Sequence, residues 1–275
     1  LVGVVSLRRL LLVSPSTPLK RIMTTDLISV RVDTDQEEVA RQVASYNLLA
    51  IPVVDEENKL AGVITVDDVI DVIKDEATED VYRLAGVSSD DRVFTKPSES
   101  LRKRLPWLLV NLVTAFAAAS IVSVFTGTIG LLPILAVLMP VVAGMGGNAA
   151  TQTLTVIVRG IALGELTWAN TRKALLKEAI VGLGNGFACG ILGALIVTLF
   201  TRGDWVLGLV LGMAMIINMF VAATAGTVIP LILRAMKVDP ALASSVFITT
   251  LTDMFGFFSF LGLASIFTKY LYTGG

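Results

Sequence analysis

The stretch ITTLTDMFGFFSF, residues 248–260, contains a single carboxylate, Asp253, among apolar and small residues. No other residue between Ala241 and Thr268 is charged. An ionised carboxylate at the centre of a membrane costs about 2.5–3.5 kcal/mol even on lenient insertion scales. Asp253 can therefore stay protonated, pair with a cation or face water. Because the stretch has no basic residue, we favour a cation site over a structural, protonated side chain.

A second run of unexpected polar residues is PVVAGMGGNAATQT, residues 140–153. Its glycines weaken a helix or let another backbone approach closely, while Asn148, Thr151 and Gln152 share one helical face. These side chains could be hydrogen-bonding glue between helices, or the run could be a broken helix that lines a wet pathway. We favour the pathway. The predicted pore-lining set takes small and polar residues from both stretches: Gly146, Gly147, Asn148, Gln152, Thr249, Thr250 and Gly256.

One carboxylate per chain would hold a cation weakly. A homodimer with residues 241–268 near its two-fold axis would bring two copies of Asp253 together. Mg²⁺ sheds water reluctantly and is often held by one or two carboxylates through its remaining waters. Two aspartates with hydroxyl and carbonyl oxygens therefore suit a largely hydrated Mg²⁺, which must be held selectively but released readily for conduction.

The composition indicates a membrane protein. Of the 275 residues, 54% are hydrophobic and only 16% are charged, against about a quarter charged in a soluble domain. Five apolar stretches follow residue 104, and each can cross a hydrocarbon core that needs about 20 helical residues. They cover residues 105–127, 131–158, 175–200, 205–233 and 241–268. The predicted fold class is an α-helical membrane protein with five transmembrane helices per chain, preceded by an α/β module and a linker helix.

The charges predict the orientation and exclude several kinds of site. Nine Lys and Arg residues flank the apolar stretches on one side of the predicted membrane and two on the other. This asymmetry places the soluble half in the cytoplasm and the C-terminus outside a plasma (inner) membrane, and it explains the basic excess without nucleic acid. With no histidine and one cysteine, Cys189, zinc sites and His-based triads are excluded, so any metal must be a hard cation held by oxygen.

A repeat in the soluble half aligns LVGVVSLRRLLLV (1–13) with LAGVITVDDVIDV (60–72). Each copy reads as a short strand that runs through a Ser/Thr turn into an amphipathic helix. Between them, residues 35–47 have helical periodicity and residues 48–66 contain two strands joined by a polar turn.

This pattern resembles the CBS domain, a module usually found in pairs. The turn GVITVDD (62–68) is similar to the nucleotide-contacting turn of that family and puts Thr65 and Asp68 at the nucleotide-binding positions. Some CBS modules bind adenine nucleotides, so ATP stays open as a ligand. Others bind nothing and serve as dimerising scaffolds, which is the alternative interpretation here.

The helix predicted over DDVIDVIKDEATED (67–80) carries seven acids and one lysine. The acids near one face are Asp68, Asp71, Asp75 and Glu79, with Glu76 and Asp80 beside them. Like charges at i,i+4 destabilise a helix by a few tenths of a kcal/mol per pair. The face could simply be solvated, but clustered carboxylates without basic partners also suit a divalent cation of modest affinity. We favour cation sensing.

A CBS module, a linker helix and five spans, in this order, resemble the MgtE family of magnesium channels. Three stretches match its motifs: RKRLPWLLVNL (102–112), PVVAGMGGNAATQTLTVIVRG (140–160) and VDPALASSVFITTLTDMFG (238–256). The resemblance implies a homodimer with a pore between the two membrane halves and Asp253 as the ion-binding residue. It also implies that regulatory Mg²⁺ bridges the CBS acids and the linker helix and closes the pore. On matching positions, the sensor ligands are Glu37, Asp68, Asp71, Glu76, Glu79 and Asp80.

The resemblance also predicts the domain boundaries. Residues 1–13 would be the tail of a first CBS module, 14–78 a second CBS module, 79–104 the linker and 105–275 the transmembrane pore domain. The family's N-terminal helical domain and most of the first CBS module are missing from this sequence, so we expect an N-terminally truncated form.

Three rival functions use the same residues differently. A proton-coupled divalent-cation exchanger would use Asp253 as its proton and cation carrier. An intramembrane enzyme would need a second catalytic group. The sequence offers no His, a single Cys in an apolar stretch and no further acid predicted to be buried, so we expect that the chain is not an enzyme. A nucleotide receptor with a passive membrane anchor would show no ion flux.

Overall fold

The fold was analysed in a computed structural model that describes residues 1–242 and 245–273. The described chain divides into two compact units, Leu1–Thr78 and Glu79–Gly275. Each unit is described separately below.

The first unit contains a three-stranded sheet and its covering helix. Strand order is β1-β2-β3, with β1 parallel to β2 and β2 antiparallel to β3. The elements are α1 (Leu7–Leu12), η1 (Leu19–Arg21), β1 (Val30–Arg31), α2 (Gln36–Ser45), β2 (Ala50–Val54) and β3 (Leu60–Thr65). Asp35 caps α2 by accepting a hydrogen bond from the Glu37 backbone N–H, as expected for an N-cap aspartate. Val39, Val43 and Ile51 form part of its apolar core.

The sequence predicted α2, β2 and β3 correctly but missed β1. The expected strand near the N-terminus is only an isolated bridge between Val4 and Thr24. The α1 helix that follows is capped by Ser6, as the repeat predicted. A two-residue strand such as β1 is too short to show a periodic hydrophobic pattern, which explains why it was missed.

The acidic helix α3 (Val66–Leu84) starts in the first unit and ends in the second. The chain turns at Gly86, whose φ of +69° favours glycine. A Cβ at Gly86 would also lie 1.9 Å from Nε1 of Trp107. Two independent constraints, the dihedral angle and the indole ring, therefore require glycine where the linker begins.

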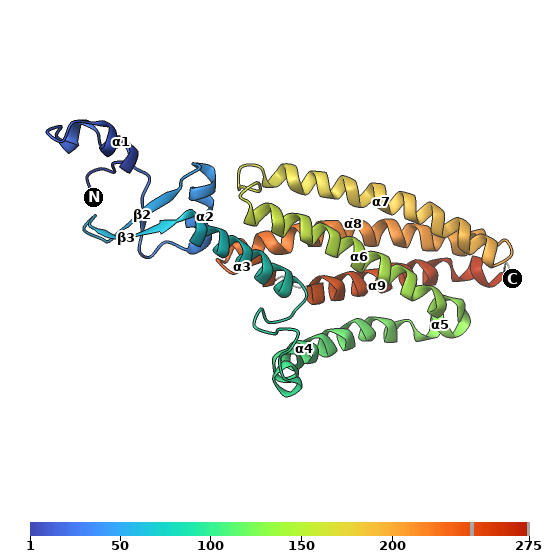
Figure 1. The fold of residues 1–275 in the computed structure, drawn as a ribbon. Helices are drawn as coiled ribbons and strands as arrows, with labels where there is room; N and C mark the ends of the chain where they lie inside the picture. The colour runs from blue at the N-terminus through green and yellow to red at the C-terminus, as the bar shows by residue number, and fades with distance from the viewer. Residues whose placement is uncertain (243–244, 274–275) are drawn as a thin grey trace. The chain divides into compact units, whose positions relative to one another are not determined.

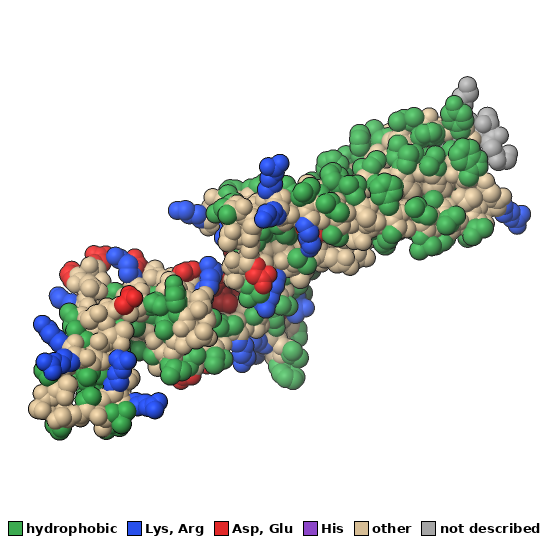
Figure 2. Space-filling view, turned by 90° about the horizontal axis from the view of Figure 1, so that it is seen from above, with side chains coloured by type: hydrophobic (Ala, Val, Ile, Leu, Met, Phe, Trp, Pro, Cys, Tyr) green, Lys and Arg blue, Asp and Glu red, His purple; other side chains and the backbone are tan. Residues whose placement is uncertain are grey.

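The second unit contains five helices long and apolar enough to cross a membrane, as predicted. Helices α6 to α9 lie side by side and α4 packs along α9 (Figure 1). On the face shown in Figure 2, hydrophobic side chains cover the length of these helices. The elements are α4 (Pro97–Val124), α5 (Thr126–Leu131), α6 (Ile134–Ala162), α7 (Thr171–Phe200), α8 (Trp205–Ala235), η2 (Pro240–Leu242) and α9 (Ser245–Thr273).

Helices α7 and α8 approach each other closely because α7 presents glycines to α8. A Cβ at Gly186 would lie 2.9 Å from the Ile216 Cα, and one at Gly190 would lie 2.8 Å from the Gly212 carbonyl oxygen. Inside lipid no hydrophobic effect drives helices together, so the van der Waals contacts made at such close approach stabilise their association. The α8 helix is also the most buried of the five spans. The pair α7–α8 therefore forms the rigid frame of the unit.

The broken helix expected around residues 140–153 is not observed, and that prediction is wrong. Helix α6 runs without interruption from Ile134 to Ala162 with Pro140 inside it. A proline is tolerated within a membrane helix when neighbouring helices stabilise it, and α6 packs against both α8 and α9. The polar residues of this stretch therefore lie on a continuous helix.

A buried carboxylate clamps the loop before α4 to the first turns of that helix. Asp91 is 3% exposed and accepts hydrogen bonds from the Ser100 hydroxyl and from Arg104 Nε, the latter at 2.6 Å. The Ser100 hydrogen bond, followed by that of Arg104, lowers the pKa of Asp91 below its usual range.

This clamp predicts a pH-dependent stability. Because the pKa of Asp91 is lower in the folded chain than in an unfolded one, about 3.9, the clamp stabilises the fold above that range. Its contribution is lost as the pH falls through the folded-state pKa. We expect Asp91→Asn to lower the thermal midpoint at pH 7, measured by tryptophan fluorescence in detergent, while the exposed neighbour in Asp90→Asn changes little. An equally large gap between wild type and Asp91→Asn at pH 3 would contradict the clamp.

Candidate functional site in the membrane helices

Asp253 lies on α9 and is half-buried within a single chain. Its carboxylate has no hydrogen bond or ion pair with any other residue that the structure describes. One turn earlier, Thr250 donates its hydroxyl proton to the Val246 carbonyl oxygen at 2.7 Å. Because that proton is used, the hydroxyl oxygen keeps its lone pairs for an incoming donor or cation. This turn of α9 therefore presents oxygen acceptors.

The two sequence stretches predicted to form the pore are brought together by the fold. Gly147 on α6 faces Thr249 on α9, and a Cβ at Gly147 would lie 3.3 Å from the Thr249 Cγ2. Asn148 and Gln152 lie on the exposed face of α6. Their amides are thus available to a partner outside this chain, as a pathway between two copies requires.

Gly146 and Gly256 differ from the prediction, because both are buried in contacts between helices rather than on an exposed pore face. Each packs against Asn218 of α8. A Cβ at Gly146 would lie 2.2 Å from Asn218 Nδ2, and one at Gly256 would lie 2.7 Å from the same atom. Asn218 was not predicted as a functional residue, although a single amide within the apolar run VLGMAMIINMF (210–220) was a visible signal.

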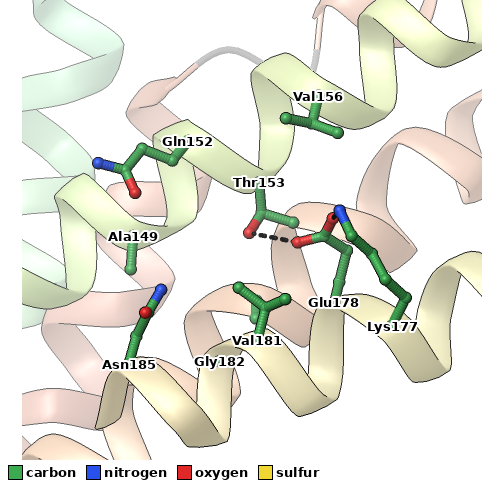
Figure 3. Close-up of a pocket in the computed structure, with 10 residues that line it drawn as sticks. Ala149, Gln152, Thr153, Val156, Lys177, Glu178, Val181, Gly182 and Asn185 are labelled. Carbon is green, nitrogen blue, oxygen red and sulfur yellow. Dashed lines mark hydrogen bonds and ion pairs between the residues drawn. The ribbon is translucent and has the colours of Figure 1, made fainter. Parts of the chain in front are cut away.

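A second missed residue is Glu178 of α7, which corrects the statement that no further acid is buried. Its side chain is only 5% exposed. Glu178 accepts a hydrogen bond from the Thr153 hydroxyl of α6 at 3.2 Å and pairs with Lys177, whose side chain is 60% exposed. Figure 3 shows Glu178 and Thr153 pointing toward each other across a pocket between α6 and α7 of about 180 Å³. Because both carboxylate oxygens have partners, Glu178 connects the α7–α8 frame to α6.

The predicted sensor residues are distributed along the surface of the chain. Asp68 accepts a hydrogen bond from Thr65 at 2.9 Å, so the two predicted nucleotide positions do lie together. Glu76 accepts a hydrogen bond from Gln36, while Glu37 and Asp71 are exposed. Among the described residues, no group of three or more acidic, His or Cys side chains is close enough to hold a metal ion.

The last turns of α3 contact the membrane helices within the second unit. Arg83 forms ion pairs with Glu79, a predicted sensor residue, and with Asp239 in the turn before α9. Leu84 packs against the apolar cluster of α6, α8 and α9. The C-terminal end of α3 is therefore attached to the segment that leads into α9, the helix that carries Asp253.

Five helices long and apolar enough to cross a membrane, a close contact between α6 and α9 and a preceding module with a three-stranded sheet are the features of a multi-pass membrane protein. Residues 139–263 match the family MgtE, described as divalent cation transporter, and residues 19–75 match the CBS domain. Over these two ranges the chain is similar to the MgtE family and to the CBS domain. This family is one of transporters rather than enzymes.

Two bacterial relatives illustrate the similarity. The magnesium transporter MgtE of Bacillus subtilis (strain 168) is 39% identical over 267 residues, which cover 97% of this chain and 59% of that protein. The magnesium transporter MgtE of Enterococcus faecalis is 39% identical over 270 residues, which cover 98% of this chain and 59% of that protein. The chain therefore spans about three fifths of the length of these relatives.

One solved structure is also similar over part of the chain. The crystal structure of the cytosolic domain of the Mg²⁺ channel MgtE in complex with ATP is 54% identical. The similarity covers 26% of this chain and 29% of the chain in that crystal structure, with a TM-score of 0.26.

The Asn218 contact predicts a contrast between two glycines of the same helix. Gly146→Ala would force a methyl group against the Asn218 amide, and overpacking of this kind costs about 1–3 kcal/mol. Gly144→Ala meets nothing within 4 Å and gains up to about 1 kcal/mol in helix propensity. We expect only Gly146→Ala to lower the thermal midpoint in detergent. Equal midpoints for the two variants would show that the contact is loose.

Proposed function

We propose that this chain forms, as a homodimer, a Mg²⁺-selective channel or transporter that takes up magnesium across the membrane. The observation that carries the proposal is the position of Asp253, a half-buried carboxylate in a membrane helix with no partner among the described residues. An ionisable group inside a membrane marks an ion pathway by default. The match of residues 139–263 to a divalent cation transporter family and the similarity to magnesium transporters support Mg²⁺ as the ion.

The proposed cation site is shared between two copies of the chain. One carboxylate with neighbouring hydroxyl oxygens leaves most of the ion's coordination to water, which suits Mg²⁺ because it dehydrates reluctantly. The exposed amides of Asn148 and Gln152 would then face the hydrated ion across the pathway. A two-fold axis that passes near α9 would place one Asp253 from each copy at the same level.

The orientation follows from the charge distribution. Basic residues gather at one end of the membrane helices: Arg102, Lys103, Arg104, Arg159, Arg172, Lys173, Lys177, Arg234 and Lys237. The positive-inside rule places this end, with the CBS part, in the cytoplasm and the C-terminus outside the plasma (inner) membrane.

The principal test is Mg²⁺ uptake into proteoliposomes, followed with an internal Mg²⁺-sensitive dye. We expect Asp253→Asn to reduce uptake at least about tenfold, which corresponds to the loss of roughly 1.4 kcal/mol of cation stabilisation. Asp204→Asn is the matched control, because Asp204 caps the start of α8 and asparagine caps equally well. Equal uptake by wild type and Asp253→Asn would contradict the proposal.

The same vesicles separate the channel from its rival. A proton-coupled exchanger with Asp253 as the carrier would lose uptake when the pH gradient is collapsed by an ionophore. A channel would continue to conduct along the Mg²⁺ gradient. We expect uptake to persist without a pH gradient, and uptake that stops would support the exchanger.

We further propose that cytosolic Mg²⁺ closes the pathway by binding the acidic set of α2 and α3. The ion would bridge surfaces of different elements or of two copies of the chain. Without bound cations the acidic surfaces repel each other, and bound Mg²⁺ would neutralise them. ATP at Thr65 and Asp68 is a further proposal, supported by the Thr65–Asp68 hydrogen bond.

This regulation predicts the effect of removing acids. In Asp71→Asn/Glu76→Gln, we expect inhibition by Mg²⁺ on the CBS side to require a concentration several times higher, within the 5- to 150-fold range of typical couplings. The control Glu56→Gln/Glu57→Gln removes the same charge from the β2–β3 turn. Inhibition curves that coincide for the sensor variant, the control and wild type would contradict the sensor.

A further inference from the structure

Asn218 is the most deeply buried amide that the structure describes in the membrane helices. It is 1% exposed, and its Nδ2 donates a hydrogen bond to the Val142 carbonyl oxygen of α6 at 2.9 Å. Its Oδ1 is buried without a hydrogen-bond partner among the described residues. An unpaired buried oxygen costs about 1–3 kcal/mol, so ordinary core packing does not explain why an amide occupies this position.

The amide joins three helices at one point. Asn218 belongs to α8, and its side chain fills the space over Gly146 of α6 and Gly256 of α9. Both glycines lack room for a methyl group, and a Cβ at Gly256 would also lie 3.3 Å from Val142 Cγ1. The distances from α8 to α6 and from α8 to α9 are therefore set by the same side chain.

The contact lies next to the residues proposed to meet the ion. Gly256 follows Asp253 by three residues, and Gly146 precedes Asn148 by two. At a rise of about 1.5 Å per residue, the contact is within roughly 5 Å of Asp253 along α9 and of Asn148 along α6. A shift at the amide would thus move the carboxylate and the amide face relative to each other.

The frame helix α8 holds this contact in place. It is packed against α7 through glycine contacts and is the most buried of the five spans, whereas α6 is less buried. The hydrogen bond from Asn218 to Val142 therefore ties α6 to the more deeply packed helix.

We propose that Asn218 is a positioning residue of the pathway. Its hydrogen bond to Val142 and its packing between Gly146 and Gly256 fix the distance between α6 and α9 at the level of Asp253. It does so without touching the ion. The inference rests on the proposed function for its meaning in transport, but the spacing itself can be measured without transport.

A disulfide between α6 and α9 measures this spacing directly. A Cβ at Gly147 lies 3.9 Å from the Thr249 Cβ, within the range of about 3.5–4.5 Å for a disulfide. We therefore use Gly147→Cys with Thr249→Cys after Cys189→Ser has removed the native thiol. The rate of oxidation is read from the loss of maleimide labelling, and single-cysteine chains show any cross-link between copies.

Two substitutions of Asn218 then test the proposal. Asn218→Leu keeps a side chain branched at Cγ but removes the hydrogen bond, and Asn218→Ala removes both the branched side chain and the hydrogen bond. We expect both variants to oxidise several-fold more slowly than the parent. Ile217→Ala, at an exposed neighbouring position of α8, should match the parent. Parental oxidation rates in Asn218→Leu would overturn the proposal, and that variant stays informative if Asn218→Ala does not fold.

Uptake supplies the second readout. In proteoliposomes we expect the Asn218→Leu chain to change the ratio of Mg²⁺ to Ca²⁺ uptake, while Ile217→Ala leaves the ratio unchanged. An unchanged ratio together with parental oxidation would reject Asn218 as a positioning residue. If the wild-type chain carries no Mg²⁺ at all, the proposed function fails, yet the oxidation rates still decide whether Asn218 fixes the spacing.

Discussion

Every polar group inside a hydrocarbon layer must find its partner within the protein, because no water is present to replace it. This constraint organises the membrane unit. The hydroxyl of Thr250 returns its proton to its own helix, Asn218 reaches across to a carbonyl of α6, and Glu178 receives a hydroxyl from Thr153. Each of these side chains has at least one partner in the protein, whereas the carboxylate of Asp253 has none among the described residues. A carboxylate without a partner in a membrane helix is energetically unfavourable, and an ion pathway needs such a group to bind the cation.

The residues that pair with other helices also explain how the helix that carries Asp253 is positioned. The α7–α8 pair is packed through glycines and serves as the frame, and α6 is connected to it at two heights by Asn218 and by Glu178. Helix α9 meets α6 through Thr249 and Gly147 and meets α8 through Gly256. The two helices that carry the proposed ion contacts are thus positioned by residues that do not contact the ion.

Much of this arrangement was readable in the sequence. Five apolar runs predict five spans because length alone decides whether a helix crosses a membrane, and Asp253 is conspicuous because no other charge lies near it. The contact of α6 with α9 could not be predicted, since it depends on where glycines leave space. Asn218 and Glu178 were missed for a related reason. Asn218 is one polar residue in an apolar run and Glu178 follows a lysine near the start of its helix, and only the packed neighbours show whether each is exposed, paired or buried. The continuity of α6 through Pro140 likewise depends on neighbouring helices rather than on local propensity.

The central claim is that the two copies of Asp253 in a homodimer form one shared cation site. Dimers assembled from mixtures of wild-type and Asp253→Asn chains, reconstituted at fixed total protein, test it most directly. If both carboxylates are needed, uptake follows the square of the wild-type fraction, so that an equal mixture retains roughly a quarter of the activity. A decline in direct proportion to the wild-type fraction would show that each chain binds and moves the ion independently, and it would contradict the account.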